Sequence, residues 1–338
     1  MRRPPAVARV LERVTATARE HDMFLPGQTI LAAVSGGPDS VCLLESLVRL
    51  RRLFKIQLEV FHLDHRLREG SSADAMYVKR LAARHRLPFH VRVATSSPRK
   101  GESVEAWASA TRLFHLRGVQ REIGADRTAE GHTLDDQAET ILMALMRGGG
   151  LQALGGIAPA LGPQVQPLIG VTRDEVESFC RSLGLRPRED PTNRDTRLLR
   201  NAVRLRILPD MERWSRRELR APLARTADLL RADEHVLAHL AFEASEGIVE
   251  ETPEGISLGA SELLTLRRPI AARVVRQAMW FLGVPPTEES IAAVLDLASG
   301  RSGRSRDLPL GSTARRDREY VHLSRPSPEG LDRGRGAP

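Results

Sequence analysis

Short apolar runs alternate with longer amphipathic segments through the first half of this chain. The apolar runs predict strands at 28–34, 57–63, 89–93 and 127–131. The amphipathic segments predict helices at 6–20, 39–53, 71–86, 103–123 and 134–147, the last of which stops at three consecutive glycines. Strands that alternate with helices are typical of an α/β fold. We therefore expect a doubly wound parallel sheet with helices on both faces.

The pattern changes after residue 150. A Gly/Pro-rich connection precedes a predicted helix at 172–183, an irregular stretch at 186–193 and an arginine-rich helix from about residue 196. Further helices are predicted at 218–246, 260–282 and 287–299, with a β segment at 255–258 and strand-like pieces within 302–323. This organisation predicts a catalytic domain over 1–216, a smaller, mainly helical domain over 217–325 and a flexible tail over 326–338.

Charge is unevenly distributed along the 338 residues. The net charge is +8, and residues 1–216 carry nine more basic than acidic residues, whereas residues 217–338 carry one more acidic than basic. A basic surface favours a polyanion such as nucleic acid. An arginine bias of a GC-rich genome is an alternative, because the chain has only three lysines. No apolar run is long enough for a membrane span, so we expect a cytoplasmic protein that does not bind membranes.

A glycine turn follows the first predicted strand, in the segment Ser35-Gly36-Gly37-Pro38-Asp39-Ser40. Two glycines allow the backbone to approach a ligand closely, and the helix that follows offers free N–H groups and a positive dipole end. Such a loop is suited to phosphate, although a simple helix cap after a glycine turn is the alternative. The segment resembles the pyrophosphate loop of ATP pyrophosphatases, which cleave ATP between its α and β phosphates.

Two further polar clusters follow predicted strands. Asp64 and His65 come after the second strand, and His132 follows the fourth, with Asp136 and Glu139 one helical turn apart behind it. Because ligands bind at the carboxyl ends of parallel strands, one pocket can gather these side chains. Carboxylates and an imidazole can hold Mg²⁺ or an ammonium group, whereas the alternative for the acidic residues is stabilisation of a helix start.

An arginine stripe lies downstream, at Arg197, Arg200 and Arg204. Helical spacing would project the three guanidinium groups from one side, where they can bind phosphates. A solvated basic face is the alternative.

Together these stretches resemble the tRNA(Ile)-lysidine synthetase family. The matching motifs, in chain order, are Ser35 to Ser40, His62 to Arg68, Gly131-His132-x-x-Asp135-Asp136-x-x-Glu139-Thr140, and Glu189-Asp190-x-x-Asn193 leading to Arg200-Asn201-x-x-Arg204. The resemblance is dense over residues 28–210 and looser afterwards.

The resemblance implies a two-step reaction on the wobble cytidine of the isoleucine tRNA with a CAU anticodon. ATP adenylates the C2 oxygen of the cytosine and releases pyrophosphate, and free L-lysine then displaces AMP to form lysidine. The implied cofactors are ATP and Mg²⁺. Loop residues Ser35 to Ser40, with Asp64 and His65, would bind the nucleotide, and Asp39 would be the Mg²⁺ ligand. The implied catalytic residues are His132, Asp136, Glu139, Arg112 and Arg200.

The chain departs from the family pattern in one helix. Where an arginine pair followed by tyrosine is expected, the chain has Ala108-Ser109-Ala110-Thr111-Arg112-Leu113, so Arg112 lacks those partners. Three alternatives stay open: a related tRNA cytidine thiolase, an amide-forming synthetase acting on a small substrate, and a non-enzymatic RNA-binding protein. The thiolase would need cysteines for an iron-sulfur cluster or a sulfur relay, and the chain has only Cys42 and Cys180. The sequence also leaves open whether the protein is a homodimer.

Overall fold

The computed structural model describes residues 4–66, 71–98, 103–188 and 195–327. The chain divides into two units, Met1–Arg231 and Ala232–Pro338. The division falls within helix α10 (Arg220–Ser245), later than the domain boundary expected after residue 216.

The first unit is built on a six-stranded sheet. Its spatial order is β3-β2-β1-β4-β6-β5, in which only the pairing of β5 with β6 is antiparallel. The strands are β1 (Thr29–Ala33), β2 (Gln57–Asp64), β3 (Phe89–Val93), β4 (Arg127–Ala129), β5 (Ala160–Leu161) and β6 (Gln164–Val165). The four long-range parallel pairings confirm the predicted doubly wound sheet. The short strands β5 and β6 were not predicted, because two residues give no readable periodicity.

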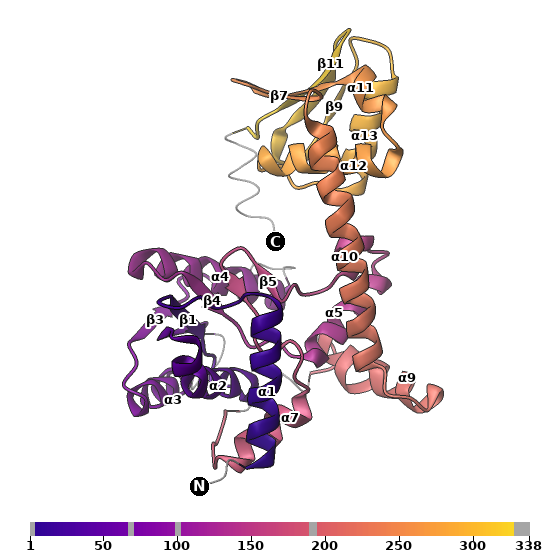
Figure 1. Ribbon diagram of the computed structural model, residues 1–338. Coiled ribbons are helices and arrows are strands. Elements are labelled where there is room, and N and C mark those ends of the chain that lie inside the picture. The colour runs from indigo at the N-terminus through magenta and orange to yellow at the C-terminus, as the bar shows by residue number, and fades with distance from the viewer. Residues whose placement is uncertain (1–3, 67–70, 99–102, 189–194, 328–338) are drawn as a thin grey trace. The chain divides into compact units, whose positions relative to one another are not determined.

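Helices cover both faces of this sheet, with α4 above the strands and α2 and α3 below them in Figure 1. The helices of this unit are α1 (Pro5–Glu20), α2 (Pro38–Phe54), α3 (Ser71–Arg84), α4 (Val104–Ile123), α5 (Leu134–Met146), α6 (Leu151–Leu154), α7 (Arg173–Ser182), α8 (Leu199–Ala202), the π-helix η2 (Val203–Ile207) and α9 (Leu208–Ser215). The predicted helices agree with these bounds closely, apart from the arginine-rich one, which begins only at Leu199.

The two faces of the sheet carry separate cores because side chains alternate along a strand. Ile30 and Ala32 of β1 pack in the core that contains α1, α2, α3 and α7. Leu31 and Ala33 pack on the other face with Leu116 of α4. Strand β1 is therefore buried on both sides, which explains its uninterrupted apolar sequence.

A buried amide ties α5 to the loop that follows α6. Gln137 accepts a hydrogen bond from the Ile157 N–H (2.6 Å) and donates one to the Ile157 carbonyl (3.1 Å), while its side chain is almost fully buried. The pair of bonds satisfies both backbone groups of Ile157 without a strand or a helix. Gln137 thereby fixes the connection between α5 and the sheet edge at β5.

The second unit combines helices with a five-stranded antiparallel sheet, ordered β7-β8-β11-β10-β9. Its strands are β7 (Val249–Thr252), β8 (Gly255–Gly259), β9 (Ser305–Asp307), β10 (Thr313–Arg316) and β11 (Tyr320–Ser324), and its helices after α10 are α11 (Ala260–Thr265), α12 (Arg268–Phe281) and α13 (Glu288–Ser299). The sequence indicated isolated β pieces here, and the structure pairs them into one sheet.

The helix predicted over 260–282 is wrong in one respect, because the structure breaks it into α11 and α12. Leu266 and Arg267 have extended backbone angles between the two helices. Pro269 follows at the first turn of α12, where its missing N–H costs nothing. The same proline in the interior of a continuous helix would remove a hydrogen bond and clash with the preceding turn, so the chain breaks before it.

Neither cysteine forms a disulfide. Cys42 and Cys180 are both free and buried in helices of the first unit. Within the ranges that the structure describes, no helix is long and apolar enough to span a membrane.

We expect Gln137→Ala to destabilise the protein by about 1–3 kcal/mol, because the Ile157 N–H loses its partner and the Ile157 carbonyl keeps only Arg231, at 3.3 Å. Chemical denaturation of the purified protein measures this change. Gln152→Ala is the matched control, since Gln152 lies exposed on α6, and its effect should stay within about 0.5 kcal/mol. Equal stability of the two variants would contradict the conclusion that the Gln137 hydrogen bonds hold the loop after α6 in place.

Candidate active site

The glycine turn between β1 and α2 is held in shape by its own side chains. Gly36 has a φ of +99°, a conformation that favours glycine, and its N–H donates to Ser40 Oγ at 3.1 Å. The Ser40 hydroxyl donates in turn to the Gly37 carbonyl at 2.9 Å and lies 3.1 Å from Ser35 Oγ. Gly37 is the N-cap of α2 and Pro38 occupies its first turn. The predicted loop is therefore a closed turn at a helix N-terminus, as phosphate binding requires.

Helix α3 and the segment that follows α7 both contact this turn. The Arg188 N–H donates to the Gly36 carbonyl at 2.9 Å, and the Arg188 Nε lies 3.0 Å from Asp74 Oδ1 on α3. An added Cβ at Gly36 would lie 3.5 Å from the Tyr77 ring. The position of the glycine turn therefore depends on α3 and on the segment that follows α7.

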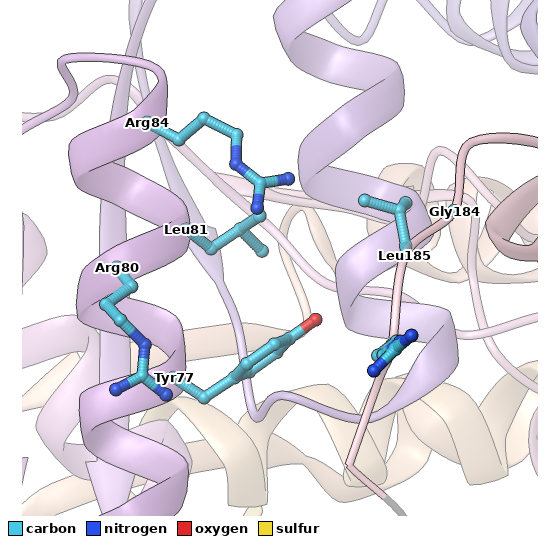
Figure 2. A pocket seen from close by; sticks show the side chains of 7 residues that line it. Tyr77, Arg80, Leu81, Arg84, Gly184 and Leu185 are labelled. Atoms are coloured by element: carbon cyan, nitrogen blue, oxygen red, sulfur yellow. The ribbon is translucent and has the colours of Figure 1, made fainter.

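A cavity of about 220 Å³ lies between α3 and the segment that follows α7. Figure 2 shows Tyr77, Arg80 and Arg84 of α3 on one side of it, facing Gly184 and Leu185 on the other. The cavity contains none of the predicted site residues, so it is separate from the cluster at the strand ends.

Asp39 carries a carboxylate oxygen without a partner. Its Oδ1 is buried and has no hydrogen-bond partner in the described part of the chain. Burial raises the pKa of Asp39 from 3.8 to about 6, and the nearby Arg173 only partly offsets this effect. A buried, unpartnered carboxylate oxygen is suited to a cation.

The end of β4 packs directly against the first turn of α2. A Cβ added at Gly131 would lie 3.2 Å from the carbonyl carbon and oxygen of Asp39 and 3.4 Å from the Ser40 nitrogen. A Cβ rarely lies this close to backbone atoms, so glycine favours this approach. It brings His132, the next residue, alongside the glycine turn.

His132 has a defined proton position. Its Nδ1 lies 2.9 Å from Gln166 Oε1, which follows β6. Because an amide oxygen can only accept, Nδ1 donates this hydrogen bond and Nε2 keeps its lone pair. His132 can therefore accept a proton at Nε2.

Asp136 combines two roles at the start of α5. Its Oδ2 accepts hydrogen bonds from the Thr133 N–H and hydroxyl, at 2.9 and 2.8 Å, and completes a capping box. Its Oδ1 lies 3.5 Å from Arg173 and 3.3 Å from Arg204. Burial alone would raise the pKa of Asp136, but Arg173, His132 and the Thr133 bonds together lower it. Asp136 is therefore a stable carboxylate.

Glu139 is the centre of a buried arginine cluster. Its side chain is 1% exposed, and Arg204 binds both of its oxygens, at 2.7 Å through Nε and 2.8 Å through a terminal nitrogen. Arg173 and Arg200 each lie 3.5 Å from the same carboxylate. Burial alone would lower the pKa of Arg204, but the Glu139 carboxylate raises it. Three guanidinium groups, from α7, α8 and η2, thus face one carboxylate, and we call them the arginine cluster. Arg200 is also hydrogen-bonded to Glu105 (3.1 Å) and Thr140 (2.9 Å).

Arg112 belongs to a separate group around the end of β2. Its terminal nitrogen lies 3.4 Å from the buried Glu130, and its Nε is buried without a partner among the described residues. His65 packs edge-on against Trp107, with ring centroids 5.8 Å apart. Burial, and secondarily the charge of Arg112, lowers the pKa of His65 to about 4. His65 is therefore neutral at pH 7.

The structure assigns a local role to some predicted residues. Asp64 Oδ1 accepts the Arg66 N–H at 2.9 Å and shapes the turn after β2. Arg197 pairs with Asp195 at the surface and does not join the arginine cluster, because α8 begins two residues after it. The motif residues Glu189, Asp190 and Asn193 lie outside the described residues.

Several site residues were not singled out from the sequence. Arg173 begins α7, where the segment shows only an ordinary capping box, and Glu130 and Gln166 follow short strands. Their only signal is a position at the carboxyl end of a strand or at the start of a helix.

Among the described residues, no group of three or more His, Cys, Asp or Glu side chains could hold a metal ion. A site that supplies one carboxylate still suits Mg²⁺, which usually keeps several waters and binds one or two carboxylates together with substrate phosphates. The unpartnered Asp39 Oδ1 at the glycine turn meets this requirement.

Asp39 is expected to destabilise the ligand-free protein at neutral pH. Because its folded pKa is raised, the stability associated with its protonated form is present below pH 4 and is lost as the pH rises through about 6. A shift of this size corresponds to about 2–3 kcal/mol. Asp39→Asn should therefore raise the free energy of unfolding by about 2 kcal/mol at pH 8, by about half as much at pH 5 and by very little at pH 3, measured with EDTA and without nucleotide.

Asp174→Asn is the control for this comparison, because Asp174 is exposed in the first turn of α7. It should show no comparable gain at pH 8. A pH-independent or negative effect of Asp39→Asn would contradict the buried, unpartnered carboxylate.

Comparison with known proteins places the chain in a family. The model of the PP-loop domain family matches residues 8–211. The tRNA(Ile)-lysidine synthase of Symbiobacterium thermophilum is 38% identical over 324 residues, which cover 89% of this chain and 66% of that protein. The enzyme of the same name from Gloeobacter violaceus is 36% identical over 293 residues, which cover 84% of this chain and 87% of that protein. The chain thus spans about two thirds of the first relative and most of the second.

A solved structure shares the fold. The U34-tRNA thiolase NcsA of Methanococcus maripaludis, solved with its [4Fe-4S] cluster, aligns over 67% of this chain and 80% of its own, with a TM-score of 0.57 and 17% sequence identity. At this identity the likeness shows the fold alone. The family match over residues 8–211 and the identity of 36–38% to the two named relatives go further: the chain belongs to the PP-loop domain family and, within it, to the tRNA(Ile)-lysidine synthases.

Proposed function

We propose that this protein ligates free L-lysine to C2 of the wobble cytidine in the isoleucine tRNA with a CAU anticodon, with conversion of ATP to AMP and pyrophosphate. Family membership supports the reaction class. The single observation that carries the proposal is the position of the unpartnered Asp39 at the glycine turn, where the charges of Arg173 and Arg204 act on it. Phosphates and a reacting base can meet between these groups. We expect the reaction in the cytoplasm.

In the first step the cytosine C2 oxygen attacks the α-phosphorus of ATP and pyrophosphate leaves. The N–H groups of the turn at Ser35 to Ser40 would hold the phosphates, and Asp39 would hold Mg²⁺. When bound, Mg²⁺ neutralises charge on the phosphates. His65, being neutral and packed on Trp107, suits a nucleotide base better than a phosphate.

The arginine cluster would stabilise negative charge that develops on the phosphates. Its guanidinium groups are held before the reaction by Glu139 and, for Arg200, by Glu105 and Thr140, so little reorganisation is needed when charge develops. The sequence alone offers Glu139 and Asp136 as carboxylates that could hold the lysine ammonium. Their oxygens already face arginines, which favours a positioning role for Glu139 in the adenylation step.

In the second step the lysine ε-amine attacks C2 and AMP leaves with the former C2 oxygen. A free ε-ammonium group has a pKa near 10.4, so its deprotonation at pH 7 costs about 4.6 kcal/mol. We propose that His132 accepts this proton at Nε2, since Nδ1 is engaged by Gln166. Arg112, whose Nε has no described partner, would contact the RNA or the adenylate.

The direct test is incubation of the purified protein with ATP, Mg²⁺, radiolabelled lysine and bulk tRNA. We expect label to enter RNA only when ATP is present and to reside in an isoleucine tRNA. Sulfur incorporation in place of lysine would favour a thiolase, and ATP consumption without tRNA would favour a small-substrate synthetase. Pyrophosphate release without any RNA product would contradict the proposal.

Glu139→Gln should reduce lysidine formation by at least about 100-fold, because the arginine cluster loses the charge that orients it. Pyrophosphate release with tRNA but without lysine measures the adenylation step separately. We expect both rates to fall together.

Glu45→Gln is the matched control for this substitution. Glu45 is equally buried, on α2, and pairs with His85 (2.8 Å) and Arg49, so its loss tests the cost of removing a buried carboxylate elsewhere. It should lower stability but not the turnover of folded protein. If Glu139→Gln raised only the KM for lysine, with adenylation intact, Glu139 would instead bind the lysine ammonium.

A further inference from the structure

Trp214 is the most exposed large apolar side chain in the described part of the chain. It lies in the last turn of α9 and is 87% exposed, whereas Trp107 is buried at 7% and Trp280 is 50% exposed. Met211, one helical turn before it, is also exposed. Tryptophan is usually largely buried, so an indole left in water on a short helix indicates a binding role.

Cationic side chains surround this indole. Arg213 precedes Trp214, and Arg216 and Arg217 follow immediately after the helix, all three of them exposed. Arg213 pairs with Asp210 at 2.5 Å, but the side chains of Arg216 and Arg217 form no ion pair or hydrogen bond in the described structure. An exposed aromatic ring beside free arginines is the arrangement that binds unpaired nucleotides, with the base stacked on the ring and the phosphates on the arginines.

The helix that carries Trp214 is joined rigidly to the arginine cluster. Arg204, which binds Glu139, lies in η2, and η2 continues directly into α9 with helical backbone angles. Leu208 at the start of α9 is buried against Ala138 and Leu142 of α5. Ten residues separate Arg204 from Trp214, a rise of about 15 Å along a helix. A few unstacked nucleotides of one strand span that distance.

We propose that Trp214 stacks a loop nucleotide of the tRNA that neighbours the cytidine in the active site, with Arg216 and Arg217 on its phosphates. This inference rests on the proposed function, because it takes the anticodon loop as the RNA. A cytidine that enters the active site must leave the stack of its neighbours. An aromatic ring about 15 Å away, on which a neighbouring base stacks, would compensate for part of the lost stacking free energy and hold the loop open.

Charge favours RNA over a protein partner on this surface. A protein interface around an exposed tryptophan needs apolar neighbours, but the residues from 213 to 218 are all exposed and, apart from Trp214, polar or charged. The basic excess of the first part of the chain points to the same partner.

The test uses the full chain and the anticodon stem–loop of the isoleucine tRNA. Trp214→Ala should weaken binding by about 5- to 100-fold, and Trp214→Phe should restore most of it, because stacking needs an aromatic ring. Replacing Arg216 and Arg217 with Ala should reduce the slope of log K against log salt by about one to two. The KM for ATP should not change in any of these variants.

Two readouts separate stacking from a structural effect. Acrylamide should quench Trp214 fluorescence in the free protein, and the stem–loop should protect it, whereas Trp214→Phe should show no such protection. Stem–loops that each carry one abasic loop nucleotide locate the stacked base: the loss caused by Trp214→Ala should disappear for one of them. Phe114→Ala is the control, since Phe114 of α4 is 71% exposed, and it should bind RNA as the unchanged protein does.

Unchanged binding by Trp214→Ala, or the same loss with every abasic loop, would overturn the inference. So would a change from dimer to monomer in Trp214→Ala without an effect on RNA binding. If the unchanged protein neither binds nor modifies the tRNA, the proposed function itself fails, and the two failures are thereby distinguished.

Discussion

The buried carboxylate of Glu139 is the interaction on which the candidate site depends. A lone ionised carboxylate with 1% exposure would be strongly destabilising, and Arg204 compensates for it with two short hydrogen bonds. Arg173 and Arg200 complete the neutralisation from α7 and α8. These helices lie far apart in sequence from α5, so this one charge fixes the relative positions of three segments.

Neutralisation of the site extends beyond Glu139. Asp135 accepts the Arg173 N–H at 2.8 Å and pairs with Arg220 at 2.8 Å, so neighbouring carboxylates of α5 bind different partners. Arg220 also binds Glu212 of α9. The chain of ion pairs therefore joins the start of α5 to α7, α9 and the beginning of α10. A site held in this way resists rearrangement, because a buried charge that lost its partners would be strongly destabilising.

The sequence predicted those parts of the site that local geometry determines. The turn at Ser35 to Ser40 was readable because two glycines between a strand and a helix have few other uses. The arginine cluster was only partly readable. Arg200 and Arg204 lie on one side, as their spacing suggested, but their contact with Glu139 was not predicted, and the stripe assumed a helix that already included Arg197. Arg173 depends on the packing of α7 against α5, which no spacing along the chain reveals.

Asp39 differs from every other carboxylate of the site in one respect. Asp135, Asp136 and Glu139 each bind an arginine, whereas the buried Oδ1 of Asp39 has no described partner and its pKa is raised to about 6. Arginines are close enough to act on its charge, and Gly131 brings the end of β4 against its backbone. Among these four carboxylates, the fold thus satisfies the three that maintain the architecture and leaves an oxygen unsatisfied on the one at the glycine turn. Natural proteins tolerate such a local cost where it prepares a site for a ligand, because the ligand then supplies the missing interaction.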